Sequence, residues 1–275
     1  MFTSRRKAAR ALKTYYYSDE LNDDFAENGI KTKRLPRDYK YFTTSPLRRA
    51  FAFVLYHFIA FPVVYVIQKI AYREKIIGRN KLKPYKKEGF FLYGNHTRAM
   101  GDAYAPSIIS FPKKAYIVVG PDAVSVTGIK RIVEDLGAIP VPDDPAGIMN
   151  YYNAVKKHAA LGHIVTVYPE SHIWPYYTKI RPFGDTSFRL PKVTGKPAFT
   201  FTATYKKRRF GKGVKTTVYI DGPFLPDPEL DARTDTARLR DLCYDAMTLR
   251  SAESTYSKNR YVKVEKQNES RAVPQ

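Results

Sequence analysis

Two short stretches of the sequence carry the residue types that acid–base chemistry needs. The first, residues 91–102, holds His96 and, six positions later, Asp102. A histidine can take up a proton near neutral pH, and a carboxylate bonded to one ring nitrogen leaves the other free as a base. The second stretch, residues 169–172, holds Glu170 and another histidine. Together they predict a general-base site, if the fold brings them to one place.

The spacing between His96 and Asp102 restricts how the two side chains can meet. Six residues of regular helix turn through about 600°, so the two would not share a helix face. Contact requires His96 on a loop and Asp102 near the start of the next helix, with Gly101 bulging between them. Two structural alternatives remain open: His96 as a solvated loop histidine, and Asp102 as a simple helix N-cap.

The sequence contains no recognised motif for binding a metal ion or a nucleotide. His163, Glu170 and His172 lack the spacing of a recognised ligand set, and His-Glu-x-x-His is absent, so no metal site is expected. Neither Gly-x-Gly-x-x-Gly nor a Walker loop is present. The single cysteine, Cys243, excludes an intramolecular disulfide and a Cys-rich zinc site, which fits a reducing, cytosol-facing environment.

The elements that must position these residues alternate along the chain. Short apolar runs that end near glycine or proline predict strands, and amphipathic stretches between them predict helices. This pattern is typical of an α/β domain with a mostly parallel sheet flanked by helices, in which ligands bind at the carboxyl ends of the strands. The predicted strands are 89–93, 114–119, 137–141, 163–168, 198–205 and 214–220, and the predicted helices are 102–109, 127–136, 148–161 and 232–250.

An apolar segment, residues 50–67, precedes this domain and carries no formal charge. It lies at the short end of the roughly 20 residues that a spanning helix needs, and Pro62 should kink it. A buried core helix, a helix in one leaflet and a full span are all compatible with it. We expect a membrane-associated N-terminal region at 1–70, a catalytic domain at 71–250 and a loose polar tail at 251–275.

The charge balance points to an anionic partner. The chain has 47 Lys and Arg against 26 Asp and Glu, a formal net charge of +21. Such a surface attracts nucleic acid, anionic lipid headgroups or phosphorylated small molecules. The 22 tyrosines suit a membrane interface as well as a nucleic-acid platform, so composition alone does not separate these partners.

The first stretch resembles the first block of the glycerophospholipid acyltransferase family, the lysophosphatidic acid acyltransferases. That block has Asn-His, four residues and Asp, whereas here five residues separate Asn95-His96 from Asp102. Later segments are similar to further blocks in the family's order, so that the resemblance covers roughly residues 78–223. These segments are Leu-Gly-Ala-Ile-Pro-Val at 136–141, Val-Tyr-Pro-Glu at 167–170, the Pro-Phe stretch at 182–188 and Lys-Pro-Ala at 196–198.

The resemblance implies a role for each candidate residue. His96 would be the catalytic base, Asp102 its partner, and Glu170 with the adjacent Ser171 would bind the acceptor. The second block lacks its arginine, and Gly-Thr-Arg-Ser does not follow Glu170. The nearest replacements for binding a phosphate, by charge and position, are Arg181, Lys179 and Arg98.

The resemblance, together with the apolar segment, therefore implies a membrane-associated O-acyltransferase. It would move a fatty acyl group from acyl-CoA or acyl carrier protein to the hydroxyl of a lysophospholipid such as 1-acylglycerol-3-phosphate. No cofactor and no nucleic acid are expected, and the enzyme would work on an anionic surface at the cytoplasmic face of the cell membrane. The alternatives are an acceptor without phosphate, such as a sugar or another lyso-lipid, and a basic nucleic-acid-binding module without catalysis.

Overall fold

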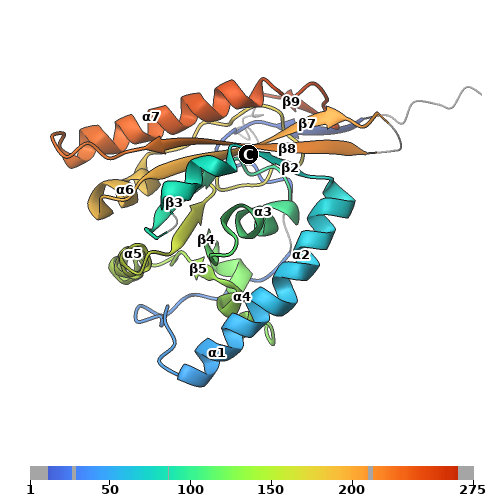
Figure 1. The fold of residues 1–275 in the computed structure, drawn as a ribbon. Coiled ribbons are helices and arrows are strands. Elements are labelled where there is room, and N and C mark those ends of the chain that lie inside the picture. Colours follow the sequence, from blue (N-terminus) through green and yellow to red (C-terminus); the bar gives the residue numbers. More distant parts are fainter. Residues whose placement is uncertain (1–11, 27–28, 86, 210–212, 266–275) are drawn as a thin grey trace, which may run out of the picture.

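A seven-stranded sheet forms the centre of the computed structural model, which describes residues 12–26, 29–85, 87–209 and 213–265 (Figure 1). The strand order is β2-β8-β7-β3-β6-β4-β5, and all neighbours are parallel except β7 and β8. The predicted α/β class with a mostly parallel sheet is confirmed. The strands are β2 Lys75–Ile77, β3 Phe90–Gly94, β4 Ala115–Val119, β5 Ala138–Pro140, β6 Ile164–Val167, β7 Ala198–Lys207 and β8 Val214–Phe224.

Helices cover both faces of this sheet. In β3 every residue is buried, and successive side chains point to opposite faces, so Phe91 and Tyr93 join one apolar cluster and Phe90 and Leu92 the other. The first cluster lies under α5 (Pro145–Ala160), α6 (Arg189–Thr194) and α7 (Ala232–Ser251). The second lies under α3 (Gly101–Ser110) and the 3-10 helix η3 (Arg79–Tyr85). Shorter helices, η4 (Pro121–Val124), α4 (Lys130–Leu136) and η5 (Thr186–Phe188), complete the described domain.

A long helical run precedes the sheet and stands along one side of the molecule (Figure 1). It consists of α1 (Pro46–Val54), η1 (Leu55–Ala60), α2 (Phe61–Ile67) and η2 (Gln68–Tyr72), and η1 and η2 are π-helical. Pro62 does not end the helix. The wider π turns immediately before it accommodate the proline, with the amide of Phe61 donating to the carbonyl of Tyr56, five residues back.

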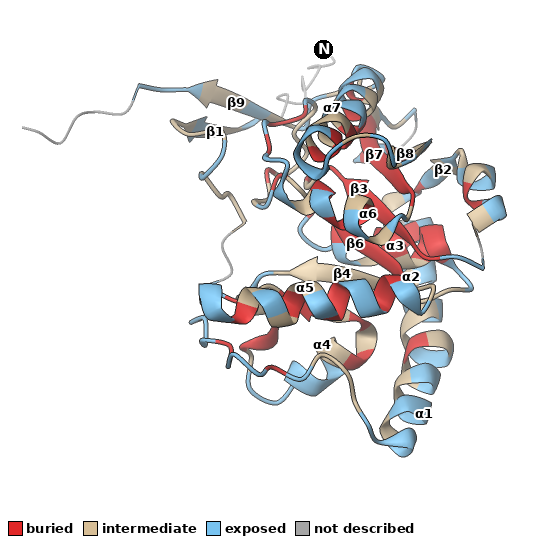
Figure 2. Ribbon diagram, turned by 90° about the vertical axis from the view of Figure 1, so that its left-hand side faces the viewer, coloured by how far each residue is buried: buried red, intermediate tan, exposed pale blue. Residues whose placement is uncertain are grey.

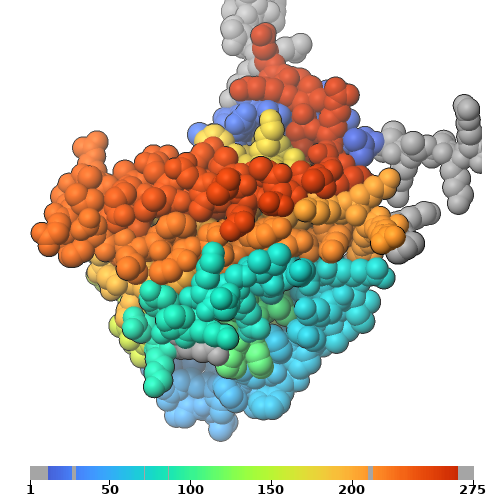
Figure 3. Space-filling view, turned by 45° about the horizontal axis from the view of Figure 1, so that its top comes forward, coloured from blue at the N-terminus to red at the C-terminus, as the bar shows by residue number. Residues whose placement is uncertain are grey.

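This run is apolar and exposed. Residues 46–70 are long and apolar enough to cross a membrane, with a mean hydropathy of 2.2, and only 6% of the most apolar window is buried. The alternative of a buried core helix is therefore wrong. Figure 2 shows the exposed surface of α1, and in Figure 3 the blue and cyan atoms of the run form the lower side of the molecule, away from α7.

The two ends of the described chain pair with each other. β1 (Lys13–Tyr17) and β9 (Asn259–Lys263) form a two-stranded parallel sheet of their own. The sequence predicts a membrane-associated region and a loose polar tail at these positions. Instead the ribbon packs through Tyr15 and Tyr261 onto Phe25, and through Tyr261 onto Trp174, so that it clamps the segment that follows β6.

Candidate active site

The two stretches that carry His96 and Glu170 lie at the same edge of the sheet. β3 and β6 are parallel neighbours, so the loop after Gly94 and the loop after Val167 leave the sheet side by side. Asn95 fixes the first loop to β7, because its side-chain amide donates to the carbonyl of Ala203 (3.0 Å) and accepts from the same residue's amide (2.8 Å). His96 follows directly.

His96 and Asp102 are in contact. The ring Nδ1 lies 3.0 Å from Oδ2 of Asp102, although the spacing is one residue longer than in the family's block. An ionised carboxylate only accepts hydrogen bonds, so Nδ1 carries the hydrogen and Nε2 of the neutral ring is left with a free lone pair. The ring stacks on Tyr168, with centroids 4.4 Å apart, and its side chain remains partly exposed at 18%.

The extra residue is taken up in the turn before α3. The amide of Asp102 donates to the carbonyl of Arg98 at 3.0 Å, and Oδ2 of Asp102 accepts the amides of Thr97 (2.7 Å) and Arg98 (2.8 Å). Gly101 does not bulge; it is the first residue of α3, and a Cβ there would press against the Arg98 side chain at 3.1 Å. Asp102 is not the N-cap, which is Met100.

A buried ion network supports the carboxylate. Burial by itself would raise the pKa of Asp102, but the hydrogen bond from His96 and the charge of Arg98 outweigh it and hold that pKa below its ordinary value. Arg98 donates through Nε to Oδ1 of Asp102 (3.1 Å) and through Nη1 to Glu74. Glu74 follows η2, and Gln68 within η2 donates to the carbonyl of Gly101 at 3.1 Å. The end of the apolar helical run is thus tied to the His–Asp pair.

Glu170 joins the two loops rather than facing a ligand. Its Oε2 accepts the amide of His96 and its Oε1 accepts the amide of Arg181, both at 2.9 Å, and its side chain is fully buried. Burial raises the pKa of Glu170, and the charge of Arg181 together with the two amides offsets only part of that rise. The geometry therefore does not support the prediction that Glu170 binds acceptor hydroxyls.

Two of the three cations expected to bind phosphate are enclosed in the protein. Arg181 donates to the carbonyls of Glu20, Glu170 and His172, and its guanidinium lies 4.9 Å from the centre of the Trp174 ring. Arg98 is equally buried, in the network described above. The predicted phosphate contacts of both arginines are therefore not supported. Lys179 and Ser171 are exposed, and Ser171 has a left-handed backbone with φ of 61°.

Several residues of this site were missed by reasoning from the sequence. Tyr168 stacks on His96 and donates to the carbonyl of Asp102. Its place in the Val-Tyr-Pro-Glu segment, two residues before Glu170, is the sequence signal that could have found it. Trp174 donates its amide to the carbonyl of His96 at 3.1 Å. Glu74 and Lys258 carry no sequence signal, and Lys258 lies 3.8 Å from the centre of the Tyr176 ring. Within the described ranges, no group of three or more His, Cys, Asp or Glu side chains could hold a metal ion.

Comparison with known proteins identifies the fold. No protein-family model matches this chain, and no curated protein matches its sequence. Its structure matches the crystal structure of the 1-acyl-sn-glycerophosphate (LPA) acyltransferase, PlsC, from Thermotoga maritima, with a TM-score of 0.51 and 14% identity over 77% of this chain and 95% of that chain. This chain has the PlsC fold. The fold that the resemblance implied is thereby confirmed.

Proposed function

We propose that this chain is a glycerolipid O-acyltransferase that transfers a fatty acyl group from a thioester to the hydroxyl of a lysophospholipid. The observation that carries the proposal is the His96–Asp102 contact of 3.0 Å at the carboxyl edge of a sheet with the PlsC fold. Ligands of open α/β sheets bind at this edge. A histidine held by a buried carboxylate is the arrangement that a general base requires.

In the proposed reaction, Nε2 of His96 removes the proton of the acceptor hydroxyl. The hydroxyl oxygen attacks the thioester carbonyl, the new C–O bond forms, and the C–S bond breaks. The leaving thiolate takes the proton back from the imidazolium, so proton and charge balance. Asp102 orients the ring and stabilises its positive form, and no covalent enzyme intermediate is needed.

The acceptor phosphate is assigned to exposed lysines, because Arg98 and Arg181 are buried. Lys179 is exposed. Lys258 lies against the ring of Tyr176, whose amide donates to the carbonyl of Thr97 at 2.8 Å, one residue from His96. A phosphate held there would place a glycerol hydroxyl near the base, and Ser171 on the same loop offers a further hydroxyl.

The exposed apolar run supports a membrane location for this reaction. Contiguous apolar surface of this kind marks a contact with lipid or protein, and both the lyso-lipid and the acyl chain reside in a bilayer. We assign the run to the cytoplasmic face of the cell membrane, where the excess of basic residues meets anionic lipid.

Turnover of lysophosphatidic acid tests the proposal. Purified protein supplied with this acceptor and acyl-CoA or acyl carrier protein should form the diacyl product. His96→Ala should lower the rate by about 10²–10⁴-fold, the usual contribution of a general base. His172→Ala, a partly exposed histidine on the neighbouring loop, is the matched control and should retain activity. Absence of turnover with every donor and lyso-acceptor, or equal rates for His96→Ala and wild type, would refute it.

The burial of both arginines favours one alternative, an acceptor without phosphate. Lys179→Ala/Lys258→Ala separates the two possibilities. A phosphorylated acceptor predicts a higher KM for lysophosphatidic acid in this variant and an unchanged KM for monoacylglycerol. Preferred turnover of a phosphate-free acceptor by the wild type, with no effect of the lysine changes, would select the alternative.

A further inference from the structure

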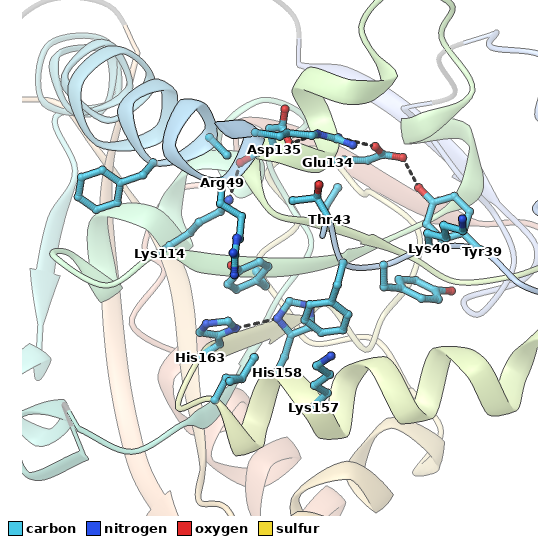
Figure 4. A pocket seen from close by; sticks show the side chains of 18 of the residues that line it. Tyr39, Lys40, Thr43, Arg49, Lys114, Glu134, Asp135, Lys157, His158 and His163 are labelled. Carbon is cyan, nitrogen blue, oxygen red and sulfur yellow. Dashed lines mark hydrogen bonds and ion pairs between the residues drawn. The ribbon is translucent and has the colours of Figure 1, made fainter. Parts of the chain in front are cut away.

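A second polar site lies at the opposite edge of the sheet from His96. A cavity of about 580 Å³ opens at the amino ends of β4, β5 and β6, between α1, α4, α5 and the segment 39–43 (Figure 4). The two edges are at least the length of β6 apart, which is roughly 13 Å for four residues at about 3.3 Å each. The cavity is therefore distinct from the proposed catalytic site.

The cavity carries more positive than negative charge. Its two carboxylates, Glu134 and Asp135, are both bonded to Arg48, at 2.9 Å each, and Glu134 also accepts the hydroxyl of Tyr39. Arg48 is thereby engaged with the acids. Four further cations line the walls, namely Lys40, Arg49, Lys114 and Lys157.

Two of these cations have a defined setting in the cavity. Lys114 is held against the carbonyl of Asp135 and the rings of Tyr56 and Tyr116, and burial lowers its pKa to about 8. An anion beside it would restore its full charge. Figure 4 shows Arg49 reaching down from α1 toward His163.

The floor is polar but uncharged. His158 and His163 lie with their Nδ1 atoms 2.8 Å apart, a distance that holds one shared hydrogen. Burial and the neighbouring His163 lower the pKa of His158 to about 3, and burial with the charges of Lys113 and Lys114 lowers that of His163. Both shifts favour the neutral form of the rings. The cations above them face no further negative charge among the lining residues.

Helix α1 forms one wall of the cavity and also carries exposed apolar side chains. Arg48, Arg49 and Phe53 of α1 line the cavity, whereas Leu47 and Phe51 on the same helix are exposed at 84% and 56%. A ligand with a phosphate and acyl chains could place the phosphate in the basic cavity and the acyl chains along the apolar side of α1. Basic pockets beside membrane helices bind anionic headgroups in this way. We propose that this cavity binds the phosphate group of an anionic phospholipid, separately from catalysis.

Vesicle binding by the full chain tests the proposal. The variant Arg49→Gln/Lys157→Gln removes two cations whose residues are both exposed. Each basic residue near an anionic surface contributes about fivefold, so binding to phosphatidylcholine vesicles that contain phosphatidic acid should weaken about 30-fold. Binding to vesicles of phosphatidylcholine alone should not change. The charge-preserving Arg49→Lys/Lys157→Arg should bind like wild type.

A control variant and soluble phosphates distinguish a specific lipid site from diffuse attraction and from a site for a soluble ligand. Lys207→Gln/Lys215→Gln removes the same charge from exposed positions on β7 and β8 and should retain binding. Equal losses in both Gln variants would show diffuse attraction and overturn the site, as would no loss in either. Tight binding of inorganic phosphate or glycerol 3-phosphate without vesicles, abolished by Arg49→Gln/Lys157→Gln, would overturn the lipid assignment in favour of a soluble phosphate ester.

Discussion

Four donors converge on the buried carboxylate of Asp102. They are the ring of His96, the amides of Thr97 and Arg98, and the guanidinium of Arg98. Charge-assisted hydrogen bonds of this kind favour the ionised carboxylate in a site where burial alone would raise its pKa. The negative charge of Asp102 is therefore a property of the folded loop, and it can be removed with little change in side-chain shape.

Asp102→Asn should lower kcat by at least about 100-fold and leave KM nearly unchanged, because the imidazolium formed during proton transfer loses its counter-charge. Steady-state rates with a saturating acceptor check this. Asp241→Asn, an exposed carboxyl on α7, is the matched control. A variant with wild-type kcat would remove Asp102 from the mechanism.

The lowered pKa of Asp102 also predicts how stability depends on pH. A carboxyl whose pKa is lower in the folded than in the unfolded chain stabilises the fold above its unfolded pKa, near 3.9, and this contribution is lost as the pH falls through the folded value. The stability difference between wild type and Asp102→Asn should therefore be constant above about pH 4 and shrink below it. Urea unfolding across a pH series measures the difference. A difference that grows on acidification would contradict the prediction.

At the residue scale, the burial of Arg98 and Arg181 could not be predicted from the sequence. Charge and position selected Arg98 and Arg181 as phosphate ligands. Their burial depends on partners that lie far away in the chain, such as Glu74 for Arg98 and the carbonyl of Glu20 for Arg181. No local pattern encodes such pairs. His96 and Asp102 could be found because the motif and the strand end coincide.

Among the elements, the end of the apolar run should contribute to stability through a buried ion pair. Glu74→Ala would leave the buried Arg98 with Asp102 as its remaining ion-pair partner, and removing one member of a buried pair costs about 3 kcal/mol or more. Thermal unfolding should show this loss. Glu253→Ala breaks an exposed pair with Lys206 and should cost less than about 1 kcal/mol. Equal effects of the two changes would contradict the assigned role of the network.

The terminal ribbon gives a second expectation at this scale. Tyr261 stacks on Trp174 with 5.1 Å between ring centroids and donates to the carbonyl of Pro175 at 2.8 Å. Since Trp174 bonds the carbonyl of His96, Tyr261→Ala should destabilise the protein by about 2 kcal/mol and reduce turnover. Tyr261→Phe keeps the stack and should cost about 1 kcal/mol. Melting curves and initial rates test both, and a fully stable, active Tyr261→Ala would exclude the clamp.

The elements differ in how far the sequence could predict them. The core strands and the helices α3, α4, α5 and α7 were predicted because apolar runs ending at glycine or proline alternate with amphipathic stretches. β1 and β9 were missed, since each has five residues and pairs with a segment 246 positions away in sequence. β2 was missed because it has only three residues.

For the whole molecule, the exposed apolar run should govern binding to neutral membranes. Phe51→Ser/Phe58→Ser should reduce partitioning into phosphatidylcholine vesicles by at least about 100-fold, because each lost phenyl removes about 1.5 kcal/mol or more of apolar burial. Co-flotation measures this. Met149→Ser/Leu249→Ser removes two equally exposed apolar side chains elsewhere and should have no effect. Unchanged flotation of the first variant would assign the run to a protein partner.

The tie between the apolar run and the His–Asp pair has a consequence for protein engineering. β1 before the run holds the loop after β6, and Gln68 and Glu74 at its end hold the first turn of α3 and Arg98. The run is therefore no detachable anchor. A detergent-free version would therefore have to keep the run and replace its exposed apolar side chains, whereas a chain shortened from its beginning would lose the ribbon that supports the loop after β6.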